Sequence, residues 1–177
     1  MPDGSPLETA VAAVVGRPVW MSWKGYGSFI AFECGVALAT VSDEPFTDDQ
    51  LFGVPVTRRV AGVGGDHCLM IEMAAWKLFS GNTRLAHSQS EREEIDSVVH
   101  WITGQHLKKM VRRGPSSVEL QFDLGARFEI GPARDGHGGD SMLSIRHEST
   151  FTTLHADGSV TVQPWGGDNP DASVRWE

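Results

Sequence analysis

Residues 102–125 read ITGQHLKKMVRRGPSSVELQFDLG, and residues 14–35 read VVGRPVWMSWKGYGSFIAFECG. Both stretches pass from an apolar helix end through a glycine into alternating apolar and polar residues, and both end at a further glycine. The first glycines, Gly16 and Gly104, lie 88 positions apart, and the closing glycines lie 90 apart. This shared order of features predicts that one structural unit occurs twice in the chain.

Each unit is predicted to begin with a helix. The sequence Ser5-Pro6-Leu7-Glu8 combines an N-cap serine, a proline at the first helical position and a glutamate that closes a capping box. Ser90-Glu91-Arg92-Glu93 has the same capping chemistry and precedes an apolar stripe at helical spacing. The stripe comprises Ile95, Val98, Val99 and Ile102. Gly16 and Gly104 are expected to end the helices, and Trp101 is expected to anchor the second helix to the sheet.

The strand patterns of the two units also correspond. Ile30-x-Phe32-x-x-Gly35 matches Leu120-x-Phe122-x-x-Gly125. In both, the period-two alternation predicts a strand with one buried face that runs into a glycine turn. A further strand is expected after each turn, at residues 36–40 in the first unit and at residues 126–130 in the second.

The two units differ by one insertion. Gly64-Gly65-Asp66 and Gly138-Gly139-Asp140 are expected as equivalent turns, yet they lie only 74 positions apart, so the first unit carries about 16 additional residues. The insertion, near residues 42–63, is predicted to be a long loop, where binding residues are often found. A loop that folds back over the sheets is the alternative. The predicted partner-binding residues are Asp43, Glu44, Phe46, Asp48, Asp49, Leu51 and Phe52.

These patterns predict an α+β fold, made by internal duplication of a helix plus an antiparallel β-meander unit. A small meander cannot bury enough apolar surface alone, so the two halves are expected to share one core with pseudo-twofold symmetry. We expect a single domain over residues 1–177. Repeat one spans residues 6–87, repeat two spans residues 90–163, and residues 164–177 form an irregular C-terminal tail, from which Trp165 or Trp176 docks.

The charge balance narrows the range of partners. The 177 residues include 15 Lys and Arg against 23 Asp and Glu, a formal net charge of −8. An acidic field repels phosphate backbones, so no nucleic-acid partner is expected. The one basic cluster, Lys108, Lys109, Arg112 and Arg113, is predicted to protect an exposed strand edge, with an acidic partner surface as the alternative.

A cytoplasmic location is expected. No apolar run approaches the roughly 18 to 20 residues needed to cross a bilayer, and the first residues lack the pattern of a signal peptide. No membrane partner is therefore predicted. The two cysteines, Cys34 and Cys68, are expected to be reduced, buried thiols, because they are too few for a disulfide scaffold.

No catalytic signature is present, and no catalytic residue, metal or cofactor is predicted. His67-Cys68 beside Asp66 is the best local metal candidate, but the paired ligand arms of a zinc site are missing. His147 and His155 lie on adjacent predicted strands and are a candidate pair. If the protein is an enzyme or a small-ligand carrier, its pocket is expected between the two repeats, with candidate residues Cys34, His67, His147 and His155.

The repeated pattern resembles a group of small actinobacterial proteins. In that group a helix ending in a glycine motif precedes a strand pair ending F-x-x-G, and a later strand carries tryptophan or serine-tryptophan. The corresponding segments here are VVGRPV and ITGQHL, FIAFECG and VELQFDLG, and CLMIEMAAWKL and SMLSIRHESTF. The resemblance covers most of residues 6–163, although the second unit lacks the later tryptophan.

Many members of this group look like immunity proteins of polymorphic toxin systems. Size, acidity and expected location are also similar to those of the immunity factor that neutralises the tuberculosis necrotizing toxin, an NAD glycohydrolase. The resemblance implies a protein that binds a cognate secreted toxin and occludes its active site, and it transfers no residue roles. The small-ligand-binding protein or enzyme and a structural or regulatory module remain as alternatives.

Overall fold

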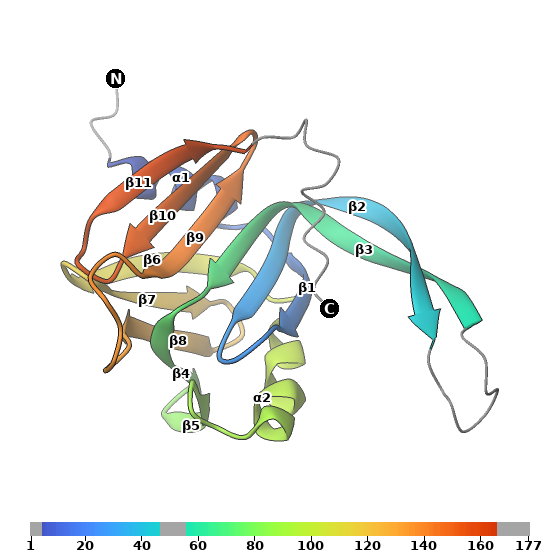
Figure 1. Cartoon of the computed structure of the whole chain (residues 1–177), viewed down its shortest axis with the longest axis horizontal. Helices are drawn as coiled ribbons and strands as arrows, with labels where there is room; N and C mark the ends of the chain where they lie inside the picture. The colour runs from blue at the N-terminus through green and yellow to red at the C-terminus, as the bar shows by residue number, and fades with distance from the viewer. Residues whose placement is uncertain (1–4, 47–55, 166–177) are drawn as a thin grey trace.

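The computed structural model describes residues 5–46 and 56–165, in which two antiparallel sheets and two short helices form the body (Figure 1). In chain order the elements are α1 (Pro6–Val14), β1 (Val19–Lys24), β2 (Ile30–Phe46), β3 (Val56–Ile71), β4 (Ala74–Ser80), β5 (Thr83–His87), α2 (Arg92–Val99), the 3-10 turn η1 (His100–Ile102), β6 (Leu107–Gly114), β7 (Ser117–Phe122), β8 (Ala126–Pro132), β9 (Ser141–His147), β10 (Thr150–His155) and β11 (Val160–Pro164).

The strands form a six-stranded sheet and a five-stranded sheet. The six-stranded sheet has the order β1-β2-β3-β9-β10-β11, and the five-stranded sheet has the order β5-β4-β8-β7-β6. The six-stranded sheet joins strands from the two ends of the chain, the five-stranded sheet uses the strands between them, and the pairings in both are antiparallel. The predicted α+β class with antiparallel strands is therefore confirmed.

A cluster of aromatic side chains joins the two sheets. Phe32 from β2 lies with its ring centroid 5.4 Å from Phe128 of β8 and 6.0 Å from Phe122 of β7. Trp76 from β4 packs edge-on against Phe128 at 5.8 Å. Ile30 and Leu120, the other apolar positions of the matched strand patterns, are fully buried. The alternation in the sequence thus identified the inner face of both strands correctly.

The first helix begins as predicted, but the second does not. In α1, Glu8 N donates to Ser5 Oγ at 3.3 Å, and Ser5 N donates to Glu8 Oε2 at 2.9 Å, which completes the capping box. In α2 the N-cap is Glu91, and no side chain caps the helix. Ser90 Oγ instead accepts a hydrogen bond from His87 N at 3.1 Å, because the hydroxyl closes the turn after β5.

The end of the second helix confirms one prediction and corrects another. Gly104, like Gly16, adopts a left-handed conformation, with φ of +88° and +77° respectively. Ile95, Val99 and Ile102 are buried. Trp101, however, is 39% exposed and does not anchor the helix. Among residues 5–46 and 56–165, the tryptophan in the buried core is Trp76, whose indole N–H donates to Ser28 O at 2.7 Å.

The chain after Gly35 departs from the expected turn and separate strand. Residues 36–40 continue β2, and Gly64 and Gly65 lie inside β3, not in a turn. Of the two matched glycines, Gly125 occupies the expected hairpin turn, between β7 and β8, and Gly35 does not. The predicted insertion loop is therefore a pair of strands wherever the structure describes it, and residues 47–55 lie outside the described residues.

The predicted irregular tail begins after a last strand. β11 pairs with β10 up to Pro164, and the Trp165 ring packs against Phe151 at 4.9 Å, which confirms docking by Trp165. Residues 166–177, including Trp176, lie outside the described residues. Within residues 5–46 and 56–165, no helix has the length and apolar character needed to span a membrane.

Candidate functional site

The ribbon, defined as residues 36–46 of β2 and 56–65 of β3, is the most distinctive surface of the molecule. It leaves the body as a long two-stranded extension (Figure 1). The pairing of β2 with β1 stops at Cys34, and the pairing of β3 with β9 begins only at Cys68. Within the described part of the chain, the two ribbon strands therefore pair only with each other, and their outer edges stay open.

A β-bulge at the base fixes how the ribbon leaves the body. The register of β2 and β3 shifts between Cys34 and Ala37, and Gly35 within the bulge has φ of +102°. Val36 N donates to Asp66 Oδ1 at 2.7 Å, and the Trp20 indole N–H donates to Gly35 O at 2.8 Å. These two hydrogen bonds hold β2 in place at the point where it leaves the core.

Gly65 permits the close approach of the two strands at this base. A Cβ atom at this position would lie less than 3.0 Å from backbone atoms of Cys34. Gly62, three residues further out, has more room, since a Cβ there would meet only Thr40 Oγ1 at 3.3 Å. The glycine-rich AGVGG sequence therefore serves strand packing and does not form a turn.

One face of the ribbon is apolar and exposed. Val41 lies opposite Ala61, and Ala39 lies opposite Val63, so their side chains share one face. Val41 is 66% exposed and Val63 is 46% exposed. A contiguous apolar strip that the body does not cover is typical of a surface that contacts another molecule.

The sequence-predicted partner residues fall at the far end of the ribbon and beyond it. Asp43 is exposed and forms a bidentate pair with Arg59, with Nε 2.8 Å from Oδ1 and Nη2 3.2 Å from Oδ2. Its charge is thus partly balanced within the ribbon. Glu44 and Phe46 lie on the last residues of β2. The other predicted residues, Asp48, Asp49, Leu51 and Phe52, lie outside the described residues.

The candidate cysteine and histidine residues gather in part beneath the bulge. His67 lies opposite Cys34 across the β2–β3 pair, and its ring centroid is 4.9 Å from that of His147. His67 Nδ1 lies 2.9 Å from Asp66 Oδ1. The predicted pair of His147 and His155 is wrong, because the two residues stand at opposite ends of the β9–β10 hairpin.

The chemistry of this cluster favours a structural role. Burial, together with nearby Cys68 and Asp66, raises the pKa of the Cys34 thiol to about 12. Burial also raises the pKa of Cys68 to about 12. Neutral thiols are poor nucleophiles and poor metal ligands. Across the described residues, no group of three or more His, Cys, Asp or Glu side chains is placed to hold a metal ion.

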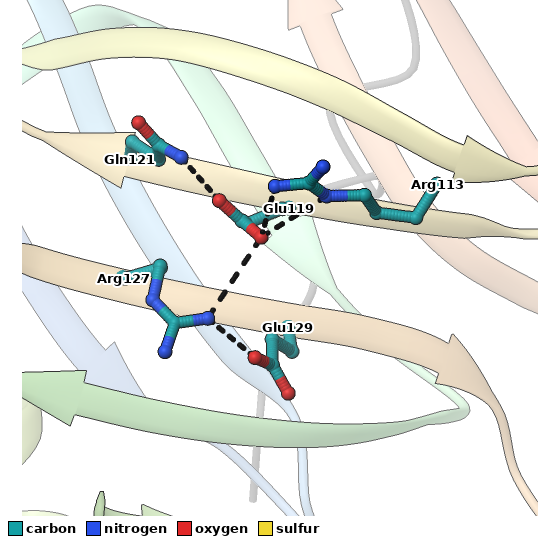
Figure 2. A network of polar contacts seen from close by, with 5 residues as sticks. All are labelled: Arg113, Glu119, Gln121, Arg127 and Glu129. Atoms are coloured by element: carbon teal, nitrogen blue, oxygen red, sulfur yellow. Dashed lines mark hydrogen bonds and ion pairs between the residues drawn. The ribbon is translucent and has the colours of Figure 1, made fainter. Parts of the chain in front are cut away.

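A polar network covers the outer face of the five-stranded sheet (Figure 2). Glu119 of β7 is only 5% exposed, although its side chain is a carboxyl group. Arg113 of the edge strand β6 donates to Glu119 Oε2 from Nη2 at 2.9 Å and from Nε at 3.2 Å, and Gln121 donates to Oε1. Arg127 lies 3.8 Å from the same carboxylate and pairs with Glu129.

The hydrogen bonds determine the ionisation of Glu119. Burial alone would raise its pKa, but hydrogen bonds from Gln121 and Arg113, with the charges of Arg113 and Arg127, hold the pKa below the ordinary value. Sequence reasoning did not find this network. Its signal was present as the polar positions that alternate with core residues in SVELQF and ARFEI, but alternation shows only that these positions face outward.

The basic cluster of the sequence lies where it was expected. Lys108, Lys109, Arg112 and Arg113 belong to β6, which is an edge strand of the five-stranded sheet. The predicted location of the basic cluster on a strand edge is therefore confirmed.

Comparison of the chain with protein-family models, with curated proteins and with solved structures returned no match. Function is consequently argued from the ribbon and from the outer face of the five-stranded sheet.

Proposed function

We propose that this protein binds another protein through the ribbon. The partner we propose is a secreted toxin, such as an NAD glycohydrolase. This chain would occlude the active site of the toxin and so act as an immunity factor in the cytoplasm. The observation that carries the binding proposal is the exposed apolar face of the ribbon around Val41 and Val63. The choice of a toxin rests on the resemblance of the sequence to immunity proteins.

The backbone of the ribbon supports the same proposal. Among residues 5–46 and 56–165 the two ribbon strands pair only with each other and present open edges, and extended segments of a partner recognise such edges by strand addition. A narrow two-stranded extension can also enter a cleft that a broad sheet cannot. Side chains on the apolar face would then be desolvated at the centre of the contact, where most binding energy is concentrated.

The charge of the chain supports a basic partner surface. The formal net charge is −8, and long-range attraction to a cationic substrate cleft would raise the association rate. Asp43 contributes less to this attraction than its position in the sequence implies, because it pairs with Arg59. The acidic and aromatic residues predicted between 47 and 55 remain a prediction for this proposal.

The test is growth rescue by co-expression with the product of the neighbouring gene. The double variant Val41→Asp/Val63→Asp places two charges on the apolar face of the ribbon. It should lose rescue and weaken binding to that product by more than about tenfold, since a desolvated charge in an interface costs at least 1–2 kcal/mol. Leu124→Asp is the matched control, because Leu124 is 71% exposed on the body.

Both variants should keep the thermal unfolding curve of the natural chain, since all three positions are exposed. Full rescue by the ribbon variant would overturn the assignment of the ribbon. Failure of the natural chain to bind or protect would overturn the immunity function.

We also propose that the scaffold arose by internal duplication. Each half supplies a helix, then three consecutive strands to one sheet, then strands to the other sheet. Gly16 N donates to Leu107 O at 2.7 Å, and Gly104 N donates to Val19 O at 2.7 Å, so equivalent positions 88 apart exchange donor and acceptor roles. Pro18 and His106, also 88 apart, form a bridge between them.

A chain in which residues 89–165 occur twice in tandem tests this proposal. It should fold cooperatively with the circular dichroism spectrum of an antiparallel β protein, because each copy would supply the partner strands that the other needs. An unfolded tandem chain would contradict the duplication.

A further inference from the structure

An open hollow of about 920 Å³ lies on the outer face of the five-stranded sheet. Small residues form its floor: Ala75 of β4 lies opposite Gly131 of β8, and Ser117 of β7 follows alongside. A Cβ atom added to Gly131 would meet only Ser117 Oγ, at 3.5 Å. The side chains that would fill this part of the sheet surface are thus missing, and the backbone is open to a ligand.

Cationic side chains outnumber carboxylates around the hollow. The cations are Lys77, Arg84, Arg113 and Arg134, and the carboxylates are Glu119 and Glu129. Glu119 is already bonded to Arg113, and Glu129 to Arg127. In residues 5–46 and 56–165, Lys77, Arg84 and Arg134 have no carboxylate within 4.0 Å, although Lys77 faces Glu129 across the strand pair. A chain of net charge −8 therefore concentrates unpaired positive charge at one hollow.

The network around buried Glu119 holds one cation of the hollow, Arg113, in place. Two N–H groups of Arg113 are fixed on the Glu119 carboxylate, so the guanidinium cannot swing away from the sheet. Charged donors held in place in this way bind an anion with less loss of side-chain entropy than free surface cations do.

A second hollow of about 650 Å³ adjoins the first and shares Ser28, Ala74 and Ala133 with it. It is lined by Tyr26, which is 91% exposed, and by Met73, which is 61% exposed. A tight turn between β1 and β2 presents Tyr26, with Phe29 N donating to Tyr26 O at 3.1 Å. Three carboxylates, Glu72, Asp135 and Asp140, lie on its wall together with His137.

We propose that the two hollows form one binding site for a small organic anion with an aromatic or apolar body. The phosphate or carboxylate group lies against Arg84, Arg134 and Lys77, where it replaces the missing carboxylate partners. The body lies against Tyr26 and Met73. The carboxylates of the second hollow repel the anionic end and so fix the direction in which the ligand binds.

Isothermal titration of the full chain tests this proposal. The probes are AMP as an aromatic phosphate, 1-naphthoate as an aromatic carboxylate and inorganic phosphate as the anionic group alone. At least one aromatic probe should bind saturably at about 0.15 M salt, where weak surface attraction is screened. It should bind at least about fivefold more tightly than phosphate, since stacking on an aromatic side chain contributes about that much or more.

Three variants locate the two parts of the ligand. Arg84→Gln/Arg134→Gln should weaken every probe that binds by more than about tenfold. Tyr26→Ser should weaken only the aromatic probes. Ala75→Phe, which fills the floor without changing charge, should abolish binding. Lys108→Gln is the matched control, because Lys108 is an exposed cation outside the hollow, and it should change affinity by less than about twofold.

The outcomes distinguish the sources of the anion. Binding of AMP alone or of 1-naphthoate alone supports the site and identifies a phosphate or a carboxylate ligand. Absence of saturable binding by both aromatic probes overturns it, as does equal weakening by Lys108→Gln and Arg84→Gln/Arg134→Gln. If inorganic phosphate binds as tightly as both aromatic probes, the second hollow does not belong to the site. None of these results depends on the ribbon or its partner.

Discussion

Strands β2 and β3 each belong to two different environments. Between Ile30 and Cys34, β2 lies in the core, where Phe32 is 1% exposed against the aromatic side chains of the other sheet. Beyond the bulge the same strand is uncovered, and Val41 is 66% exposed. The backbone pairing continues through both regions, so the difference lies in which side chains another sheet covers.

The contrast shows that two strands of this molecule can pair along their backbones without the stabilisation that buried side chains supply. Burial of apolar side chains between sheets supplies most of the free energy of folding, whereas an isolated two-stranded hairpin is marginally stable. The ribbon therefore depends on the body to hold its base. Its exposed apolar residues contribute little to folding and are available for binding.

The largest expected difference in the free energy of unfolding is between truncation of an apolar side chain in the core and truncation of one in the ribbon. Phe32→Ala should lower the free energy of unfolding by about 3–5 kcal/mol, because it removes a ring that contacts both Phe122 and Phe128. Val41→Ala should lower it by less than about 1 kcal/mol. Urea denaturation measures both. Equal losses would show that the ribbon packs against a surface that covers it.

A glycine pair tests the boundary between the two regions. Gly65→Ala should cost about 1–3 kcal/mol, because its Cβ would displace the backbone of Cys34. Gly62→Ala, on the ribbon, should be neutral within about 0.5 kcal/mol, because only the Thr40 hydroxyl must move.

Thiol labelling at pH 8 provides a second measurement for the glycine pair. Cys34 and Cys68 should label slowly in the natural chain, since both are buried and their pKa values are raised to about 12. Gly65→Ala should accelerate labelling, and Gly62→Ala should not. Unchanged labelling in Gly65→Ala would contradict the close packing at the base.

The ion pair in the covered region should contribute more to stability than the ion pair in the ribbon. Glu119→Gln should lower stability by about 1–2 kcal/mol near neutral pH, because the buried carboxylate accepts bonds from Arg113 and Gln121. The pKa of Glu119 is lowered on folding, so its stabilisation is present above the ordinary value of 4.5 and is lost as the pH falls through the folded value.

Thermal unfolding between neutral pH and pH 3 checks this prediction. The difference between the natural chain and Glu119→Gln should shrink as the acid range is entered. A difference that stays constant with pH would show that the charge of Glu119 does not stabilise the sheet.

The smallest effect is expected in the ribbon. Asp43→Asn removes one partner of Arg59, yet both side chains are more than half exposed. Exposed ion pairs contribute little to stability, so the urea denaturation curve should overlay that of the natural chain. A loss as large as that of Glu119→Gln would contradict the distinction between the covered and the uncovered region.

Much of the fold follows from local sequence. The capping box of α1 was predictable because Ser5 and Glu8 interact within one helical turn. The inward positions Phe32 and Phe122 were predictable because a strand alternates its faces. The second capping box failed because Ser90 hydrogen-bonds to the turn after β5, a partner that the helix pattern does not include.

The candidate sites were less predictable. Segment 42–63 was identified as the region that distinguishes the two units, but it was expected as a loop. Its paired strands depend on a bulge at Gly35 and on Asp66, which meet across β2 and β3. The anion site was not predicted, because Lys77, Arg84 and Arg134 come from β4, from β5 and from the segment after β8.

The sequence by itself determined the helices, the alternating strands and the side chains that face inward, because these depend on spacing along a few residues. Only the tertiary structure decided where β2 and β3 leave the core, why Trp76 is buried while Trp101 is exposed, and which cations line one hollow. Those properties depend on which distant segments cover a given surface. Coverage is set by the packing of two sheets, and no local pattern records it.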